Sequence, residues 1–95
     1  MPAGEDATAF VEKKMQTLRR ALLRQLAHYF SEENWAKDAW LQQQADGEGW
    51  VSLRLVSNFN RMQMLCKDHA FILECALESD KIEVSACGQY VRSSA

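Results

Sequence analysis

The spacing of apolar residues in the first third of the chain predicts one long amphipathic helix. Apolar side chains recur at intervals of three and four residues, which places them on one helical face that ends near Phe30. We expect order to begin near Ala7, after a flexible lead-in over residues 1–7. The members of this stripe are Val11, Met15, Leu18, Leu22, Leu26 and Tyr29.

The middle of the chain predicts two shorter helices separated by a loop. Asn34 can cap a second helix over about residues 35–44, because its side chain can accept a hydrogen bond from an early backbone amide. The segment ADGEG then ends this helix, and a short extended piece follows over residues 50–53. Helical spacing resumes over residues 55–65.

The last third predicts a helix and then a β-hairpin. The helix begins at His69 or Ala70 and ends near Ser79, after which residues 81–92 alternate and turn like a hairpin. Helices, one short strand and a terminal hairpin are typical of a winged helix. The expected fold class is therefore α+β and mostly helical, with a small antiparallel sheet and a C-terminal hairpin wing. We expect one domain over residues 8–93.

Composition limits the classes of function that the chain can have. Ninety-five residues with 47% apolar content can bury one modest core. A formal net charge of -2 argues against a broad basic surface that coats nucleic acid, where phosphate neutralisation supplies most of the affinity. The first helix is rich in Lys and Arg, whereas residues 68–83 are mostly acidic, so nucleic acid could be bound only locally.

The three cysteines indicate a reducing compartment. Their number is odd, their spacing fits no disulfide framework, and neither a signal-peptide pattern nor a membrane-spanning stretch is evident. We therefore expect an intracellular protein, in the cytoplasm rather than the nucleus, without membrane contact. Zinc binding would have to use Cys66 and His69 with Cys75 or Cys87, but no Cys-x-x-Cys pair organises them. We expect free cysteines, no metal and no cofactor.

Three side chains near the end of the first helix outline a candidate pocket. Gln25, His28 and Tyr29 are three and four residues apart and so share one helical face. A glutamine within an apolar stripe costs free energy of desolvation unless it is hydrogen-bonded, which suggests that the stripe ends at a polar pocket. Glutamine offers a donor and an acceptor to a base edge, and Tyr29 offers a ring for stacking. Tyr29 could equally be a half-buried core tyrosine with its hydroxyl at the surface.

Two runs of ordered polar and aromatic residues extend this pocket: QLAHYFSEENWAKDAWL over residues 25–41 and GWVSLRLVSNFNRMQML over residues 49–65. Together they resemble the La motif, the RNA-binding module of the La and La-related proteins. The resemblance covers about residues 13–92 and is somewhat closer to the La-related branch. It implies a winged helix that binds the 3′ ends of single-stranded RNA, of oligo(U) or poly(A) type. It also implies an adjacent RNA-recognition domain, absent from this chain.

The resemblance implies roles for particular residues. Asp38 matches an aspartate that accepts hydrogen bonds from the 2′ and 3′ hydroxyls of the last nucleotide; a carboxylate suits a diol and repels a 3′ phosphate. Trp40 and Phe59 match rings that stack on bases. The expected RNA-binding residues are Gln25, His28, Tyr29, Asn34, Asp38, Trp40, Phe59, Asn60 and Arg61.

Several of these residues also have ordinary structural explanations or depart from the family pattern. An aspartate such as Asp38 in the first turn of a helix complements the helix dipole, and Trp40 and Phe59 could belong to the core. His28 stands where the family commonly has tyrosine or phenylalanine, and Trp40 where it usually has phenylalanine. Trp35 replaces an aliphatic residue, which we interpret as a change in core packing.

A winged-helix module that binds a protein is the main alternative, because the rings could dock a peptide and the net charge is acidic. A peptide groove, however, has no evident need for a diol acceptor such as Asp38. Duplex DNA is less favoured, because the segment over residues 53–65 offers only Arg54 and Arg61 to phosphates. No nucleophile and base lie at an interpretable spacing, so we expect no enzymatic activity.

Overall fold

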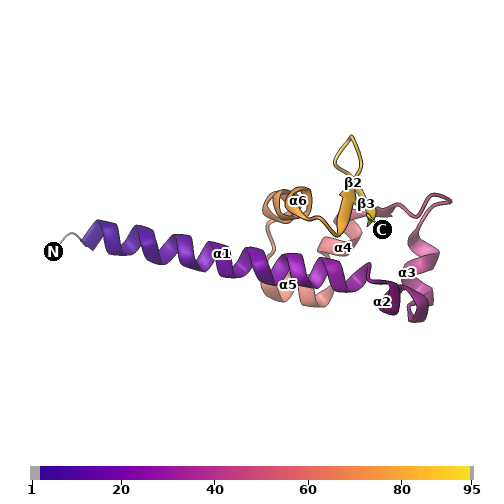
Figure 1. Ribbon diagram of the computed structural model, residues 1–95, viewed down its shortest axis with the longest axis horizontal. Coiled ribbons are helices and arrows are strands. Elements are labelled where there is room, and N and C mark those ends of the chain that lie inside the picture. Colours follow the sequence, from indigo (N-terminus) through magenta and orange to yellow (C-terminus); the bar gives the residue numbers. More distant parts are fainter. Residues whose placement is uncertain (1–2, 95) are drawn as a thin grey trace.

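Six helices and a three-stranded antiparallel sheet make up the described part of the chain (Figure 1). The computed structural model describes the backbone of residues 3–94 and the side chains of residues 8–94. In chain order the elements are α1 (Ala3–Tyr29), α2 (Glu32–Lys37), α3 (Ala39–Gln44), β1 (Val51–Ser52), α4 (Leu53–Ser57), α5 (Asn60–Leu65), α6 (His69–Glu78), β2 (Ile82–Val84) and β3 (Tyr90–Ser93).

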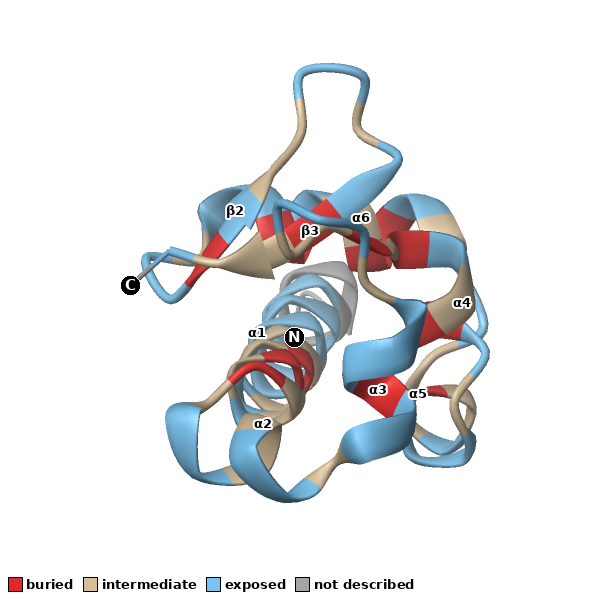
Figure 2. Ribbon diagram, turned by 90° about the vertical axis from the view of Figure 1, so that its right-hand side faces the viewer, coloured by how far each residue is buried: buried red, intermediate tan, exposed pale blue. Residues whose placement is uncertain are grey.

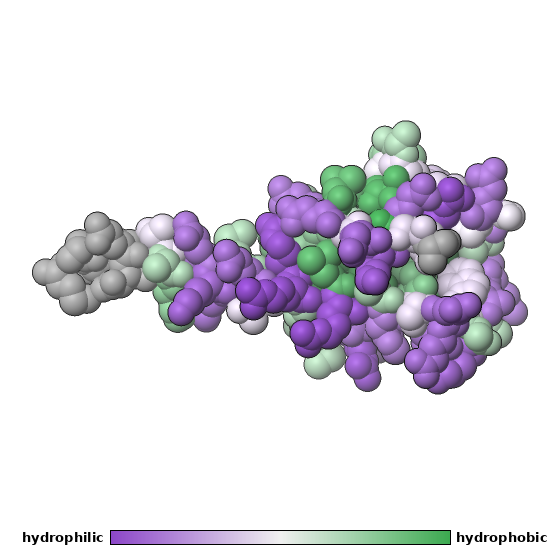
Figure 3. Space-filling model, viewed as in Figure 1, coloured by the Kyte–Doolittle hydropathy of each residue, from purple (hydrophilic) through white to green (hydrophobic). Residues whose placement is uncertain are grey.

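The long first helix is confirmed, but only its second half packs against the rest of the domain. Leu22 and Leu26 are fully buried, whereas Val11 and Met15 of the same stripe are 53% and 46% exposed. The first half of α1 therefore projects away from the domain (Figure 1), and its described surface is largely hydrophilic (Figure 3). The helix begins at Ala3, earlier than predicted, and the first two residues of the expected lead-in lie outside the described residues.

The second predicted helix is wrong in its boundaries, because the segment forms two short helices that meet at Asp38. The Asp38 backbone leaves the helical region, and its Oδ1 accepts a hydrogen bond from the Leu41 amide at 2.9 Å, which begins α3. The predicted cap is also wrong. Ser31 caps α2, where its Oγ accepts from the Asn34 amide at 3.2 Å, and Asn34 lies inside the helix.

The third predicted helix is likewise divided, into α4 and α5. Ser52 caps α4, and the Asn58 side chain donates to the Arg54 carbonyl at 2.8 Å where α4 ends. Phe59 then has extended backbone angles, so the helical hydrogen bonds are interrupted before α5 begins at Asn60. This break places the Phe59 ring beside the last turn of α1.

The remaining elements confirm the predicted helix and hairpin. Asp68 caps α6, where its Oδ1 accepts from the amides of Ala70 and Phe71. The strands are ordered β1-β3-β2, with Val51 opposite Val91 and Val84 also opposite Val91. The loop between β2 and β3 extends away from the helices (Figure 2) as the wing of the fold.

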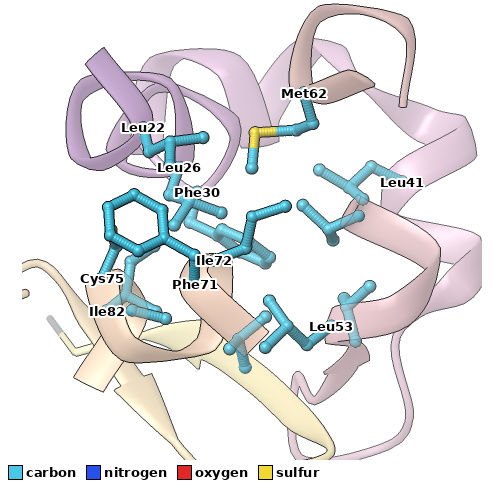
Figure 4. Close-up of a cluster of buried hydrophobic side chains, with 14 residues drawn as sticks. Leu22, Leu26, Phe30, Leu41, Leu53, Met62, Phe71, Ile72, Cys75 and Ile82 are labelled. Atoms are coloured by element: carbon cyan, nitrogen blue, oxygen red, sulfur yellow. The ribbon is translucent and has the colours of Figure 1, made fainter. Parts of the chain in front are cut away.

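One hydrophobic core lies between the second half of α1, α6, the central short helices and the sheet (Figures 2 and 4). Its fully buried side chains include Leu22, Leu26, Leu41, Leu53 and Ile72. This core fixes the end of α1 relative to α3 and α5. The predicted site residues lie on α1, α2, α3 and α5, or at the caps Asp38 and Phe59. No described helix is both long and apolar enough to cross a membrane.

Candidate nucleic-acid interface

Three aromatic side chains from separate parts of the chain meet at the end of α1. The Tyr29 and Phe59 rings are 5.1 Å apart between centroids and perpendicular, and the Trp40 and Phe59 centroids are 5.8 Å apart. Tyr29 and Phe59 are half-buried, whereas Trp40 is 52% exposed. We refer to Tyr29, Trp40 and Phe59 as the aromatic cluster. His28 lies at its edge, exposed and 6.3 Å from Tyr29 between ring centroids.

Gln25 lies one turn before Tyr29 and has an unsatisfied polar atom. Its Nε2 is buried and forms no hydrogen bond with any described group. Burial raises the pKa of the Tyr29 hydroxyl above its ordinary value of 10.0, and the nearby Gln25 amide and Arg61 cation offset part of that rise. The amide is thus close to the hydroxyl without meeting hydrogen-bond geometry. A buried donor without an acceptor costs roughly 1 to 3 kcal/mol, so this atom suits a ligand.

Asn34 and Asp38 connect the elements that hold the cluster. The Asn34 Nδ2 donates to the Tyr29 carbonyl at 3.0 Å, and the Asp38 amide donates to the Asn34 carbonyl at 3.0 Å. Asp38 then caps the helix that holds Trp40. Its Oδ1 is used by this cap, while its Oδ2 has no hydrogen-bond partner among the side chains of residues 8–94. Asn34 therefore has a structural role, and Asp38 retains a carboxylate oxygen for a ligand.

Asn60 and Arg61 follow Phe59 as the first residues of α5, and both are exposed. The effect of Arg61 on the pKa of Tyr29 shows that its charge is near the cluster. Arg61 forms no ion pair with another described residue, so it is available to a phosphate. Asn60 is near the cluster through its place in the chain next to Phe59, and its side chain forms no hydrogen bond with another described residue.

A surface groove lies outside the predicted site. It has a volume of about 630 Å³ and lies between α2, the loop before β1, and β2 and β3. Phe30 and Trp35 contribute its aromatic side chains. Trp35, whose departure from an aliphatic residue we interpret as a change in core packing, does pack partly against the core, and it also lines this groove.

The cysteines do not form a metal site in the described chain. Cys66 is half-buried, Cys75 is buried and Cys87 is exposed, and all are free. Burial raises the pKa of the Cys75 thiol, which keeps it protonated near neutral pH. Among the side chains of residues 8–94, no three of His, Cys, Asp or Glu are grouped so as to hold a metal ion.

The helices, the hairpin wing and the aromatic cluster at the end of α1 define a winged-helix domain of the La type. The family model described as "La domain" matches residues 22–78, more than half of the chain. The chain belongs to the La domain family.

Curated relatives include both La and La-related proteins. The chain is 36% identical over 74 residues to the La RNA-binding domain-containing protein LHP1 of Cryptococcus neoformans, covering 78% of this chain and 8% of that protein. It is 36% identical over 89 residues to the La-related protein Larp4B of Drosophila melanogaster, covering 94% of this chain and 6% of that protein. The chain thus spans less than a tenth of the length of these two relatives.

Solved structures agree with the winged-helix fold. The La autoantigen N-terminal domain superposes with a TM-score of 0.76 at 29% identity, covering 81% of this chain and 86% of that one. The La motif of the Dictyostelium discoideum La protein superposes with a TM-score of 0.71, also at 29% identity, covering 82% of this chain and 88% of that one. The predicted fold class is confirmed.

Proposed function

We propose that this domain binds single-stranded RNA and recognises a 3′ end with free hydroxyls. The observation that best supports the proposal is the unsatisfied Gln25 Nε2 beside the aromatic cluster, in a chain of the La domain family. A base carbonyl could accept a hydrogen bond from this buried donor after a small side-chain movement. The relative LHP1 is described as containing a La RNA-binding domain, which agrees with this proposal.

Stacking would supply much of the affinity. Trp40 offers an exposed ring, while the perpendicular arrangement of Tyr29 and Phe59 presents two differently oriented rings beside it. Base–aromatic stacking contributes about 1 to 3 kcal/mol per base and tolerates different bases. The cluster therefore suits two or three unpaired nucleotides better than a duplex, whose bases are already stacked. His28 at the edge offers a smaller stacking surface than a six-membered ring.

Polar groups around the cluster would select the end of the RNA. The Asp38 Oδ2 can accept from a ribose hydroxyl, while its charge disfavours a terminal phosphate. The free cation of Arg61 can neutralise an internal phosphate, and the Asn60 amide can contact a base edge. We propose that an RNA-recognition domain elsewhere in the full-length protein adds contacts to the same RNA.

The direct test is fluorescence anisotropy with short U, A, C and G oligoribonucleotides labelled at the 5′ end. Each is prepared with a 3′ hydroxyl or a 3′ phosphate, and binding is measured at near-physiological salt. We expect tighter binding of the hydroxyl form of at least one oligonucleotide. Equal binding of the two forms would refute 3′-end recognition, and no binding by the folded domain would refute RNA binding by this domain alone.

The stacking role is tested with Trp40→Ala, because an exposed ring can be removed with little effect on the core. A loss of about 1 kcal/mol or more corresponds to about fivefold weaker RNA binding. Met64→Ala is the matched control, since Met64 is 85% exposed and lies outside the cluster. If Trp40→Ala binds RNA as tightly as this control, the ring has no role in stacking.

A further inference from the structure

The groove beside α2 differs in chemistry from the aromatic cluster. We refer to the pocket lined by Phe30, Glu32, Trp35, Glu48, Glu83 and Arg92 as the acidic groove. Its volume of about 630 Å³ lies within the range of roughly 300 to 1,000 Å³ that is typical of ligand sites. Its lining shares no residue with the predicted RNA site.

The apolar part of the groove consists of two rings. The Phe30 and Trp35 rings are nearly parallel, with an interplanar angle of 24° and centroids 6.1 Å apart. Phe30 is 4% exposed and anchors the pair in the core, whereas Trp35 is only half-buried. Trp35 can therefore offer an indole surface to an incoming apolar or cationic side chain.

The single cation that lines the groove is already engaged. The Arg92 Nε donates to Glu83 at 2.6 Å, its Nη1 donates to the Glu48 carbonyl at 3.0 Å, and its guanidinium lies 4.1 Å from the centre of the Trp50 ring. The positive charge of Arg92 thus neutralises mainly the carboxylate of Glu83. The carboxylates of Glu32 and Glu48 form no ion pair with a described cation, so the rim has an excess of negative charge.

We propose that the acidic groove binds a protein segment that carries Lys or Arg beside an apolar residue. The cationic side chains would pair with Glu32 and Glu48, and one side chain would pack on Trp35, where a desolvated cation over an indole is favourable. The same carboxylates repel phosphates, so a polynucleotide is a poorer occupant. This protein-binding surface is additional to the proposed RNA site.

Two consecutive residues, Tyr29 and Phe30, point toward the aromatic cluster and the acidic groove respectively. Tyr29 contacts Phe59 of the aromatic cluster, and Phe30 contacts Trp35 of the acidic groove. Phe30 directly follows α1, and its amide still donates to the Leu26 carbonyl at 3.3 Å, so the two residues keep nearly helical directions, about 100° apart. This directs the two rings toward different surfaces. One ligand can therefore occupy each surface, and the two can be measured separately.

The tryptophans allow this measurement, because Trp40 belongs to the aromatic cluster whereas Trp35 lines the acidic groove. We would follow the indole N–H signals by two-dimensional NMR during a titration with the peptide acetyl-Gly-Arg-Leu-Lys-Arg-Gly-amide. The same peptide with glutamate in place of its basic residues is the control. We expect the basic peptide to shift the Trp35 signal and leave that of Trp40 unchanged, and the acidic peptide to shift neither.

Charge-removing variants provide a second readout. Glu32→Gln and Glu48→Gln should each weaken binding of the basic peptide about threefold, the effect expected of one partly exposed ion pair. Glu33→Gln is the matched control, since Glu33 also lies in the first turn of α2 but is 3.9 Å from Lys37 and outside the groove. Circular dichroism confirms that each variant is folded.

Three outcomes would overturn the proposal. The first is the absence of a Trp35 shift with the basic peptide, and the second is an equal loss of peptide affinity with Glu33→Gln, which would indicate a general charge effect. The third is a shift of Trp35 by a 3′-hydroxyl oligoribonucleotide, which would make the groove part of an RNA path. If no oligoribonucleotide binds the folded domain and the Trp40 signal does not shift with RNA, the proposed function is refuted. The shift of the Trp35 signal by the basic peptide would stand independently of that result.

Discussion

Asp38 combines two tasks in one carboxylate at the residue scale. One oxygen caps α3 through the Leu41 amide, and the other is available to a ligand. Removing the side chain would therefore disturb the fold and the site together. An amide in its place separates the two tasks, because asparagine caps a helix about as well as aspartate but has no charge.

We predict that Asp38→Asn keeps the stability of the domain and loses most of its preference for a 3′ hydroxyl over a 3′ phosphate. The preference should fall by about tenfold, because hydrogen bonds to a charged acceptor are about twice as strong as neutral ones. Asp38→Ala should in addition lower the free energy of unfolding by about 1 kcal/mol. Anisotropy and urea unfolding measure the two effects, and an unchanged 3′ preference in Asp38→Asn would exclude the proposed contact.

The Tyr29 hydroxyl makes stability sensitive to alkaline pH. Its pKa is raised by burial, so above about pH 10 the unfolded chain releases a proton that the folded domain retains. The free energy of unfolding should be unaffected by Tyr29 below that pH and fall as pH rises through the folded-state pKa.

Urea unfolding at about pH 8 and about pH 11 tests this dependence. Tyr29→Phe should lose less stability between the two conditions than the parent protein, while Tyr90→Phe, at the start of β3, serves as the control. The same loss in Tyr29→Phe as in the parent would show that the alkaline loss arises elsewhere.

The sequence predicted which side chains lie near one another at the end of α1, but not their contacts. Spacing correctly placed Gln25 and Tyr29 on one helical face, and the unsatisfied Nε2 agrees with a polar pocket at the end of the stripe. The role of Asn34 could not be predicted, because its side chain reaches the carbonyl of Tyr29, five residues earlier, across a change of chain direction. A local sequence pattern can indicate that an asparagine caps a helix, but it does not show a hydrogen bond that joins two helices.

At the element scale, the breaks in the second and third predicted helices are what bring the rings together. Periodicity continued through both breaks, because a short interruption leaves the apolar residues at nearly helical spacing. At the first break the information lay in Asp38, whose side chain competes for a backbone amide and begins α3. At the second break it lay in Asn58, whose side chain donates to the Arg54 carbonyl where α4 ends. Prediction therefore identified the helical segments and missed two of their boundaries.

The link between α1 and α2 can be tested through Asn34. We predict that Asn34→Ala lowers the free energy of unfolding by about 1 kcal/mol, since it removes a partly buried hydrogen bond to the Tyr29 carbonyl. RNA binding should also weaken, because the last turn of α1 is less well held. Glu33→Ala, in the same helix but exposed, is the control, and equal stability of these two variants in urea would contradict the role of Asn34.

At the scale of the whole molecule, α1 belongs only in part to the domain. Periodicity predicted a single stripe, but no other described element is long enough to cover its first half. The hydrophobic pattern thus gave the correct helix without showing where packing begins. A stripe indicates which face can be buried, whereas burial itself depends on the extent of the other elements.

A matched pair of substitutions tests whether only the second half of α1 is packed against the core. Leu22→Ala should lower the free energy of unfolding by about 2 to 5 kcal/mol, because it leaves a cavity in the core. Met15→Ala, two turns earlier in the same stripe, should change it by less than about 0.5 kcal/mol. Urea unfolding of both variants is the measurement, and a large effect at Met15 would show that the projecting half of α1 is packed in solution.

The projecting helix also determines how the protein moves through solvent. The domain measures 57 × 26 × 22 Å, and its radius of gyration is 15.2 Å, against about 12 Å for a compact domain of this length. Such a body meets more friction than a sphere of equal mass and tumbles more slowly about its short axes than about its long axis. A monomer should therefore elute early in size-exclusion chromatography, and its apparent mass there will overstate the number of subunits.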